Sequence, residues 1–390
     1  MREQTSREAL PEEFRRFARG VERDGAPRYA GICRGIATDP WLLDLVAQAP
    51  PDQRRPNIIL AAVHYLLLGG ADHPLAAWYP TVAALHGQPV GATCAPFDDV
   101  DGAPLADGIF TAFASFCRAH RDELALLIAT RATQTNEVGR CTALLPALST
   151  VAKRSNGAPL AVVDLGTSAA LNLHFDEYAY RYAMHDATRD AGRAGSRVML
   201  HCDVIDGEPP TAPVAVARRI GVDRSPVDVR DDDSARWLLA CQWPDHLDRF
   251  SLARDAIALA RSSDQPVEMV EGDLVESLRR LVPTVPDHAH LCLVHTWVAA
   301  YLTPDEQRAL RAEIAAIATT RPVSWLFAEA PYEVPELPLP LSPDGSGKSP
   351  TAVVLVEDGP DAPAPSASRL ADMHSHGRWL RWFGLVGQGR

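Results

Sequence analysis

The sequence predicts an α/β protein in which a helical N-terminal region, residues 1–155, packs on a parallel-sheet domain, residues 156–390. Two patterns predict this fold. Apolar residues before residue 155 recur at three- and four-residue spacing, which is typical of helices. After residue 158, short apolar runs alternate with helical stretches, which is typical of a parallel sheet covered on both faces.

Two helices of the N-terminal region are recognisable from their residues. Residues 57–68 are apolar on nearly every side, which predicts a buried helix. His64 on this helix is either a catalytic group or, as is more usual at such a position, a hydrogen-bonded core residue. Residues 110–131 predict a second helix from apolar positions three and four residues apart.

Six short apolar runs predict the strands of the second domain. They are residues 159–164, 219–223, 267–273, 290–295, 323–328 and 351–356. Helices are predicted between several of them, at residues 234–240, 249–261 and 304–320. Residues 182–195 are polar without a clear period and predict a loop or insertion.

The composition excludes several classes of protein. The chain is 46% hydrophobic and 23% charged, which indicates a folded globular protein. A net charge of −12 argues against nucleic acid and anionic membranes as partners, because both attract clustered Lys and Arg. The sequence has neither an apolar run of about 18 residues nor an apolar signal segment, so we expect a cytoplasmic protein. Scattered cysteines without a C-x-x-C motif predict no metal site.

Polar residues follow the predicted strands, at the edge where parallel sheets bind ligands. Asp164 ends the first strand and precedes a glycine turn with Gly166 and Ser168, whose backbone N–H groups suit a ligand. Asp223 ends the second strand and suits two ribose hydroxyls, and Asp273 ends the third and suits an exocyclic amine. The alternative for both is a helix N-cap.

The fourth predicted strand ends at His295, whose imidazole suits proton transfer near neutrality. His374 and His376 form an H-x-H pair in an expected terminal strand, where a structural role is favoured because two histidines alone do not make a zinc site. The sequence contains no P-loop, G-x-S-x-G, H-E-x-x-H or G-x-G-x-x-G motif, which disfavours the corresponding enzyme classes.

This series of strand ends resembles the nucleoside-binding half of S-adenosylmethionine (SAM)-dependent methyltransferases. The resemblance implies a Rossmann-like, methyltransferase-type sheet. The residues that would hold the cofactor are Asp164, Gly166, Ser168, Asp223 and Asp273. The chain departs from the pattern at Ala170, where methyltransferases have a second glycine against the methionine part of SAM. Either the site tolerates alanine, or the scaffold has been kept and the cofactor lost.

Four segments together are similar to the bacterial family DUF2332, a domain of unknown function. They are residues 53–68, 131–141, 164–172 and 374–379. Proteins similar to this family include an enzyme that builds aziridine rings in azinomycin-type natural products. That enzyme works with a small partner subunit and displaces sulfate by a neighbouring amine. The resemblance implies comparable chemistry and a comparable partner for this chain.

Residues 134–140 place five polar groups between apolar helical segments. If this stretch is helical, Arg131, either Asn136 or Thr135, and Arg140 share roughly one face, where two guanidinium groups would bind a carboxylate or sulfate. The alternative is an intrahelical pair of Glu137 and Arg140 with no ligand. The expected substrate contacts are Asn57, Tyr65, Arg131, Gln134, Asn136, Arg140 and Asn172, and the expected catalytic groups are His64, Glu137 and His295.

The sequence therefore predicts a small-molecule tailoring enzyme that needs no cofactor. It would hold an anionic, amine-bearing substrate between its two regions and align the amine for intramolecular displacement of a leaving group such as sulfate. Two alternatives stay open, a SAM-dependent methyltransferase and a non-catalytic subunit of a biosynthetic complex.

Overall fold

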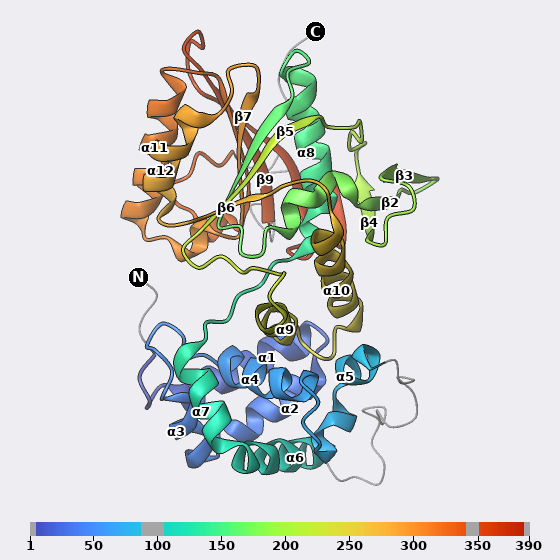
Figure 1. Cartoon of the computed structure of the whole chain (residues 1–390), viewed down its shortest axis with the longest axis vertical. Helices are drawn as coiled ribbons and strands as arrows, with labels where there is room; N and C mark the ends of the chain where they lie inside the picture. Colours follow the sequence, from blue (N-terminus) through green and yellow to red (C-terminus); the bar gives the residue numbers. More distant parts are fainter. Residues whose placement is uncertain (1–4, 87–104, 341–350, 386–390) are drawn as a thin grey trace. The chain divides into compact units, whose positions relative to one another are not determined.

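The computed structural model describes residues 5–86, 105–340 and 351–385 (Figure 1). The chain forms two compact units, one of residues 2–135 and 229–254 and the other of residues 136–228 and 255–390. The expected domain boundary at residue 155 stays a prediction. The compact units begin and end elsewhere, because α8 (Cys141–Arg154) packs on strands β4, β9 and β10 whereas α9 (Asp232–Ala240) packs on α4. None of the described helices has the length and apolar character needed to span a membrane.

The unit of residues 2–135 and 229–254 is helical, as predicted for most of it. Its helices are α1 (Leu10–Arg23), α2 (Pro27–Ile36), α3 (Pro40–Val46), α4 (Pro56–Leu68), α5 (Pro80–Leu85), α6 (Leu105–Ala119), α7 (Arg121–Thr130) and α9. Helix α4 is buried on nearly every side, as its composition predicts. The single helix predicted over residues 110–131 is wrong, because the backbone at His120 leaves helical geometry (φ −110°, ψ 31°) and separates α6 from α7.

Eleven strands in the described residues form one sheet in the order β3-β2-β4-β11-β10-β9-β8-β7-β1-β5-β6. Strands β6, β5, β1, β7 and β8 are parallel, whereas β9 and β10 run antiparallel to their neighbours. The strands are β1 (Leu160–Leu165), β2 (Ala179–Ala183), β3 (Thr188–Gly192), β4 (Met199–Asp206), β5 (Val216–Asp223), β6 (Glu268–Glu271), β7 (His290–Thr296), β8 (Val323–Glu329), β9 (Thr351–Asp358), β10 (Ser366–Met373) and β11 (Trp379–Trp382).

All six predicted strands are present, and the sheet also contains strands that the sequence did not predict. The loop expected at residues 182–195 is wrong, because β2 and β3 pair there as an antiparallel hairpin. The strand β9 was expected in a parallel sheet but is antiparallel to β8. His374 and His376 lie in the turn between β10 and β11 rather than in a strand.

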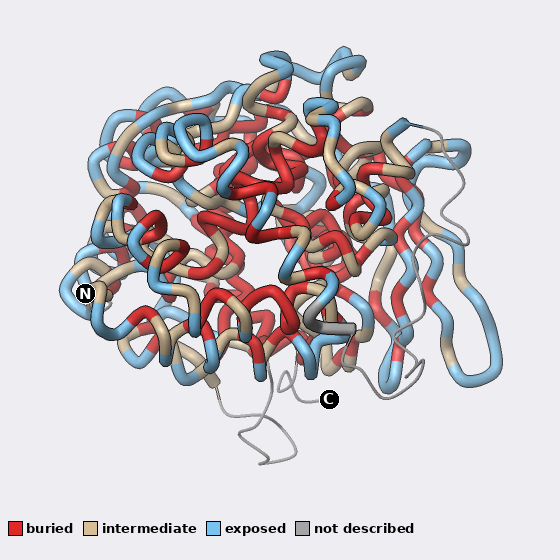
Figure 2. Tube along the Cα trace, turned by 90° about the horizontal axis from the view of Figure 1, so that it is seen from below, coloured by how far each residue is buried: buried red, intermediate tan, exposed pale blue. Residues whose placement is uncertain are grey.

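The central strands have two differently packed faces. Strands β1 and β8 are buried along their whole length. Figure 2 colours the buried residues of the chain red. Val163 and Leu165 of β1 and Leu293 of β7 belong to an apolar core that includes residues of α11 (Leu274–Leu281) and α12 (Pro304–Ala318). Figure 1 shows α11 and α12 on one side of these strands and α8 on the other. Because side chains alternate along a strand, Asp164 projects from the face opposite Val163.

Candidate functional site

The carboxyl ends of β1 and β7 are the natural place for a ligand in this sheet. Strand β1 has β5 on one side and β7 on the other, so the strand order changes direction at β1. In open α/β sheets, ligands bind outside the carboxyl ends of the strands at such a switch point.

Strained backbone gathers at the same edge of the sheet. Ser168 (φ 54°), Ala170 (φ 56°) and Trp297 (φ 56°) have left-handed conformations that non-glycine residues rarely adopt. Ser168 and Ala170 follow β1, and Trp297 follows β7. Strain of this kind is retained where the surrounding structure holds it, and it concentrates at functional sites.

Asp164 is a buried carboxyl at the end of β1, with only 5% of its surface exposed. Burial raises its pKa to about 7, the nearby negative charge of Asp223 adds to this effect, and a hydrogen bond from the Thr167 hydroxyl and the positive charge of Arg140 oppose it. The hydroxyl donates to Asp164 Oδ2 over 2.8 Å. A carboxyl that titrates near neutrality is suited to proton transfer.

Two of the segments that carry the family resemblance meet behind the turn after β1. The Asn136 side-chain carbonyl accepts a 2.8 Å hydrogen bond from the backbone N–H of Leu171. The Cys141 thiol lies 3.4 Å from the side-chain oxygen of Asn172. Asn136 and Asn172 are buried, so these contacts hold the backbone of the turn rather than form an open binding surface.

Arg140 joins three parts of the chain at this edge. Its Nη1 donates to the carbonyl oxygen of Thr296 over 3.0 Å, and its Nε donates to the carbonyl oxygen of Ser375 over 3.1 Å. Its guanidinium also lies 5.9 Å from the centre of the Trp297 ring. Arg140 therefore ties the end of β7 to the turn between β10 and β11.

The same turn carries a histidine that pairs with Glu137. His376 Nδ1 lies 3.0 Å from Glu137 Oε2, with 29% of the histidine side chain and 5% of the glutamate side chain exposed. Glu137 also accepts a hydrogen bond from the backbone N–H of Gly139. The two segments touch so closely that a Cβ atom on Gly377 would lie 1.9 Å from the Gly139 carbonyl oxygen.

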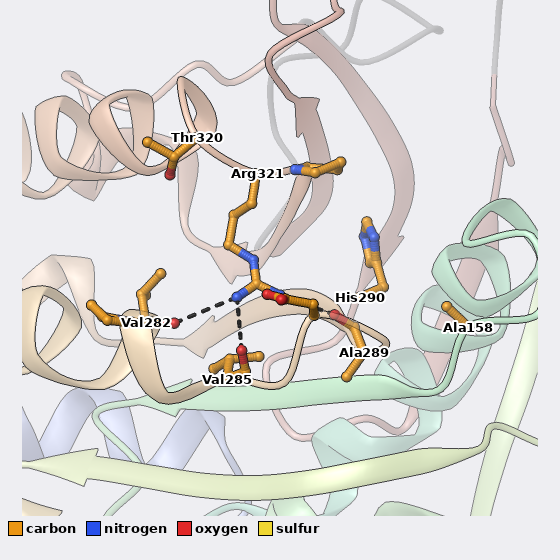
Figure 3. Close-up of a pocket in the computed structure, with 10 residues that line it drawn as sticks. Ala158, Val282, Val285, Ala289, His290, Thr320 and Arg321 are labelled. Carbon is orange, nitrogen blue, oxygen red and sulfur yellow. Dashed lines mark hydrogen bonds between the residues drawn. The ribbon is translucent and has the colours of Figure 1, made fainter.

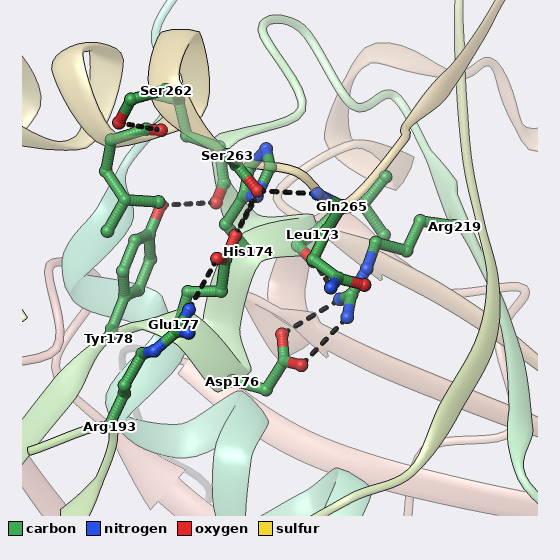
Figure 4. A network of polar contacts seen from close by, with 12 residues as sticks. Leu173, His174, Asp176, Glu177, Tyr178, Arg193, Arg219, Ser262, Ser263 and Gln265 are labelled. Carbon is green, nitrogen blue, oxygen red and sulfur yellow. Dashed lines mark hydrogen bonds and ion pairs between the residues drawn. The ribbon is translucent and has the colours of Figure 1, made fainter.

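A polar network fixes η3 (Leu171–Glu177), the short helix that follows the turn after β1 (Figure 4). Arg219 binds both carboxylate oxygens of Asp176 and donates to the Leu173 carbonyl oxygen. The Glu177 carboxylate is held by His174, Arg193 and Ser263. The corresponding distances are 2.8 Å to His174 Nδ1, 2.8 Å to Arg193 Nη1 and 2.6 Å to Ser263 Oγ. This network stabilises the helix that directly follows the strained turn at Ser168 and Ala170.

The residues expected to hold SAM have other partners. Asp223 accepts backbone N–H groups of Ser168 and Ser225, each over 2.8 Å. Asp273 is the N-cap of α11, as its alternative interpretation proposed, and also pairs with Arg224.

The glycine turn is also covered by a protein side chain. A Cβ atom on Gly166 would lie 2.4 Å from Val298 Cγ2, so Val298 occupies the space against this backbone. Ala170 adds a methyl group to the same turn. These contacts occupy the positions that the resemblance assigns to SAM, and binding of SAM stays a prediction to be tested. In the described part of the chain, no group of three or more His, Cys, Asp and Glu side chains could hold a metal ion.

His295 lies on the other face of the sheet from Asp164. Asp164 is the register partner of Val294, so the next residue, His295, projects with the core residues Leu293 and Phe327. Its side chain is 1% exposed, its Nδ1 lies 2.7 Å from Glu329 Oε1, and its ring stacks on Phe327. The structure thus gives His295 a core environment, and its predicted role as the base loses support.

His64 lies in the helical unit as a core histidine with both ring nitrogens engaged. Nδ1 lies 3.0 Å from the Ala240 carbonyl oxygen and 3.1 Å from that of Gln242, and Nε2 lies 2.7 Å from the Thr81 hydroxyl. Burial lowers its pKa to about 4. This arrangement supports the core alternative rather than a catalytic role.

The other predicted contacts of the helical unit surround Asp233. Tyr65 and Arg131 both donate to its carboxylate, which lowers the pKa of Asp233. Arg131 also lies near the rings of Tyr65 and Trp237. Asn57 is half-buried in the first turn of α4, and Gln134 is half-buried in the extended segment after α7.

Residues 131–140 do not form the helix on which a shared polar face would depend. Arg131 ends α7 with an extended backbone (φ −101°, ψ 150°), and Glu137 is also extended (φ −84°, ψ 99°). Only η2 (Val138–Arg140) has a helical turn. The polar side chains therefore do not form one helical face. They contact different parts of the folded chain instead.

Two surface hollows lie at the opposite edge of the sheet. The larger, about 450 Å³, is lined by residues such as Ala158, His290 and Arg321, which precede β1, begin β7 and precede β8 (Figure 3). Arg321 donates there to carbonyl oxygens that include those of Val282 and Val285. The second hollow, about 300 Å³, lies at the start of β5 and β6. The position of Asp164 and the strained turns favours the carboxyl edge as the site.

The sequence did not predict the pairing of Glu137 with His376 or the raised pKa of Asp164. Both depend on contacts between distant segments. The sequence offered one hint of the pairing: Glu137 and His376 both lie in segments that carry the family resemblance, residues 131–141 and 374–379.

A family model described as an uncharacterized protein conserved in bacteria (DUF2332) matches residues 11–382. No curated protein matches the chain. The match covers the helices before β1 and every strand of the sheet.

Proposed function

Because the chain belongs to the bacterial family DUF2332, which is described only as uncharacterized, we propose its function from its own side chains. We propose that it is a small-molecule tailoring enzyme in which Asp164 accepts a proton from the amine of a bound substrate. The amine displaces an oxyanion leaving group, such as sulfate, within the same molecule. Closure to an aziridine follows the resemblance to aziridine-forming enzymes.

The observation that carries this proposal is the position of the buried Asp164 carboxyl at the carboxyl end of β1, where the strand order changes direction. Burial raises the pKa of this carboxyl to about 7. Such a carboxyl can accept a proton and release it again near neutral pH. Its negative form also attracts a substrate ammonium group, which binds before it is deprotonated.

The rate of this reaction depends mainly on how the attacking nitrogen and the breaking C–O bond are aligned. The nitrogen lone pair forms the new C–N bond, the C–O bond breaks with its electron pair on the leaving oxygen, and Asp164 takes the proton that the nitrogen loses. Holding the nitrogen in line with the C–O bond contributes about 7–11 kcal/mol to such a closure. The turn after β1 is held in place by Asn136 and by the polar network around η3. It therefore offers a rigid surface for this alignment.

The test is release of the leaving group by the purified full chain. A panel of amino-alcohol sulfate esters is incubated with the wild type, with Asp164→Asn and with Asp190→Asn, and free sulfate is measured by ion chromatography. Asp190 is a surface carboxylate paired with Arg181 and serves as the control. We expect the turnover rate of Asp164→Asn to be at least about 100-fold lower than that of the wild type. Equal turnover by the three proteins, or none by the wild type, contradicts the proposal.

SAM binding is tested separately by calorimetry on the wild type and Ala170→Gly. The engaged Asp223 and Asp273 and the position of Val298 lead us to expect no binding by the wild type. Tight binding by the wild type would instead favour a methyltransferase.

A further inference from the structure

We infer that the larger hollow, at the amino edge of the sheet, is a second binding site and that it takes a small zwitterion with an apolar side chain, such as an apolar amino acid. The hollow measures about 450 Å³. Ligand pockets of about 300–1,000 Å³ combine an apolar lining with a few polar groups. The inference is independent of the proposed function, because Ala158 of the hollow precedes β1 whereas Asp164 lies at the other end of that strand.

Most of the residues that line the hollow are apolar. They are Ala158, Val282, Pro283, Val285, Ala289 and Pro322. These residues come from the segment before β1, from η4 (Val282–Thr284) and the loop before β7, and from the turn before β8. Side chains of this kind favour contact with aliphatic groups, because such contact removes apolar surface from water. The lining therefore suits a ligand with an aliphatic side chain.

Arg321 supplies the positive charge of the hollow and also holds one of its walls (Figure 3). Its Nη1 donates to the carbonyl oxygens of Val282 and Val285 over 3.4 and 3.2 Å. Its Nη2 donates to those of Pro286 and Ala289 over 3.5 and 3.0 Å. These partners are neutral, so no carboxylate of the described residues pairs with this guanidinium. A positive charge left in this state at a hollow attracts an anionic group.

Asp287 supplies a negative charge at the same wall. It is exposed, and Arg321 binds the carbonyl oxygens of Pro286 and Ala289 on either side of it. Both charged residues lie in the described part of the chain, and their side chains form no ion pair with each other there. A carboxylate beside Arg321 and an ammonium group beside Asp287 match this arrangement. An amino acid carries both groups on one carbon atom.

His290 adds a neutral polar group to the hollow. Its Nε2 lies 2.8 Å from the Ser324 hydroxyl oxygen, which fixes the ring. Burial lowers the pKa of His290, the negative charge of Glu357 opposes this effect, and the positive charge of Arg321 adds to it. Glu357 is itself paired with Arg154. The imidazole is therefore neutral near pH 7, which leaves one positive and one negative residue in the lining and favours a zwitterion over a simple anion.

The experiment compares three probes that share one carbon skeleton. L-Valine carries both charges, 3-methylbutanoate lacks the amine and 2-methylpropylamine lacks the carboxylate. Binding of each probe to the wild-type full chain is measured by isothermal titration calorimetry at neutral pH. We expect L-valine to bind a few-fold more tightly than 3-methylbutanoate, because Asp287 is exposed, and at least about 10-fold more tightly than 2-methylpropylamine, because Arg321 is half-buried.

Two variants test whether binding occurs at this hollow. Asp287→Asn changes an exposed carboxylate and should weaken L-valine binding by about 3- to 5-fold without weakening that of 3-methylbutanoate. Ala158→Trp fills the hollow and should abolish binding of all three probes. Asp190→Asn, on the edge strand β3, is the matched control and should bind L-valine as the wild type does. Circular dichroism checks that each variant is folded.

Three results overturn the inference. One is the absence of detectable L-valine binding by the wild type. Another is binding of 3-methylbutanoate or 2-methylpropylamine as tightly as L-valine, because the ligand is then not recognised as a zwitterion. The third is unchanged L-valine binding by Asp287→Asn and by Ala158→Trp, which places the site elsewhere. The proposed function stands in all three cases, because its test is the release of sulfate and the requirement for Asp164.

Discussion

The His295 and Glu329 side chains are in a contact that is closed to solvent, with 2.7 Å between Nδ1 and Oε1. The same Glu329 oxygen accepts the backbone N–H groups of Val298 and Ala299 over 2.8 and 3.0 Å. One carboxylate thus orients the end of β7 and the start of η5 (Ala299–Tyr301).

Replacing Glu329 should therefore cost stability. Glu329→Ala removes the acceptor of the Val298 and Ala299 backbone N–H groups and the partner of the buried His295, so we expect the free energy of unfolding to fall by about 3–5 kcal/mol. Urea denaturation followed by circular dichroism measures it. Glu276→Ala, at an exposed position of α11, is the control and should change stability by less than about 0.5 kcal/mol. A loss of the same small size at both positions would contradict the structural role of Glu329.

The raised pKa of Asp164 predicts a specific pH dependence of stability. Its pKa is about 7 in the folded chain against an ordinary value of 3.8, so the folded state keeps the proton over this range and the unfolded state loses it. The contribution of Asp164 to stability is therefore complete below pH 4 and is lost as the pH rises to 7, by about 4 kcal/mol. Asp164→Asn cannot titrate and should gain stability relative to the wild type across this window. Parallel stability curves for the two proteins would show that Asp164 has an ordinary pKa.

His64 predicts the opposite slope. Burial lowers its pKa from 6.5 to about 4, so the unfolded state takes up a proton first as the pH falls. Its contribution to stability is present above pH 6.5 and decreases by about 3 kcal/mol towards pH 4. His64→Gln should remove this part of the acid sensitivity, whereas a control substitution, His185→Gln at a surface histidine, should leave it unchanged. Unchanged acid sensitivity in His64→Gln contradicts the prediction.

Gly377 should tolerate no side chain. It has a positive φ of 72°, and a Cβ there would lie 1.9 Å from the Gly139 carbonyl oxygen. We expect Gly377→Ala to lower the free energy of unfolding by about 3 kcal/mol, part from the left-handed backbone and part from the overlap. Gly195 has a similar φ of 77° but open space around it, so Gly195→Ala isolates the backbone contribution of about 1–2 kcal/mol. Thermal or urea unfolding of both variants compares them, and equal losses would exclude the close contact.

The parts of the fold that the sequence predicts are those whose signal is local. Strands β1, β7 and β8 are continuous apolar runs because both of their faces are buried, and that pattern is visible in the residues themselves. The hairpin β2–β3 was missed because β3 is polar and mostly exposed, so that only β2 carries buried residues, Tyr180 and Tyr182.

The parts of the site that could not be predicted depend on tertiary contacts. A shared polar face on residues 131–140 depended on a helix there, but Asn136 bonds the backbone of Leu171 and Glu137 lies against His376. Spacing along the chain carries no information about such partners. Similarly, the exposure that separates His376 from His295 follows from the strand register and the turn, which the sequence does not show.

The partners of His64 have a consequence for synthesis of the chain. Its Nδ1 meets carbonyl oxygens of Ala240 and Gln242, which the ribosome adds 176 and 178 residues later. At about 5–20 residues per second, roughly ten to thirty seconds pass between the synthesis of α4 and the synthesis of that later segment. During this time the apolar surface that α9 will cover is unfinished. We therefore expect the nascent helical unit to be a client of chaperones until residue 254 has emerged, and a truncation after residue 135 to aggregate.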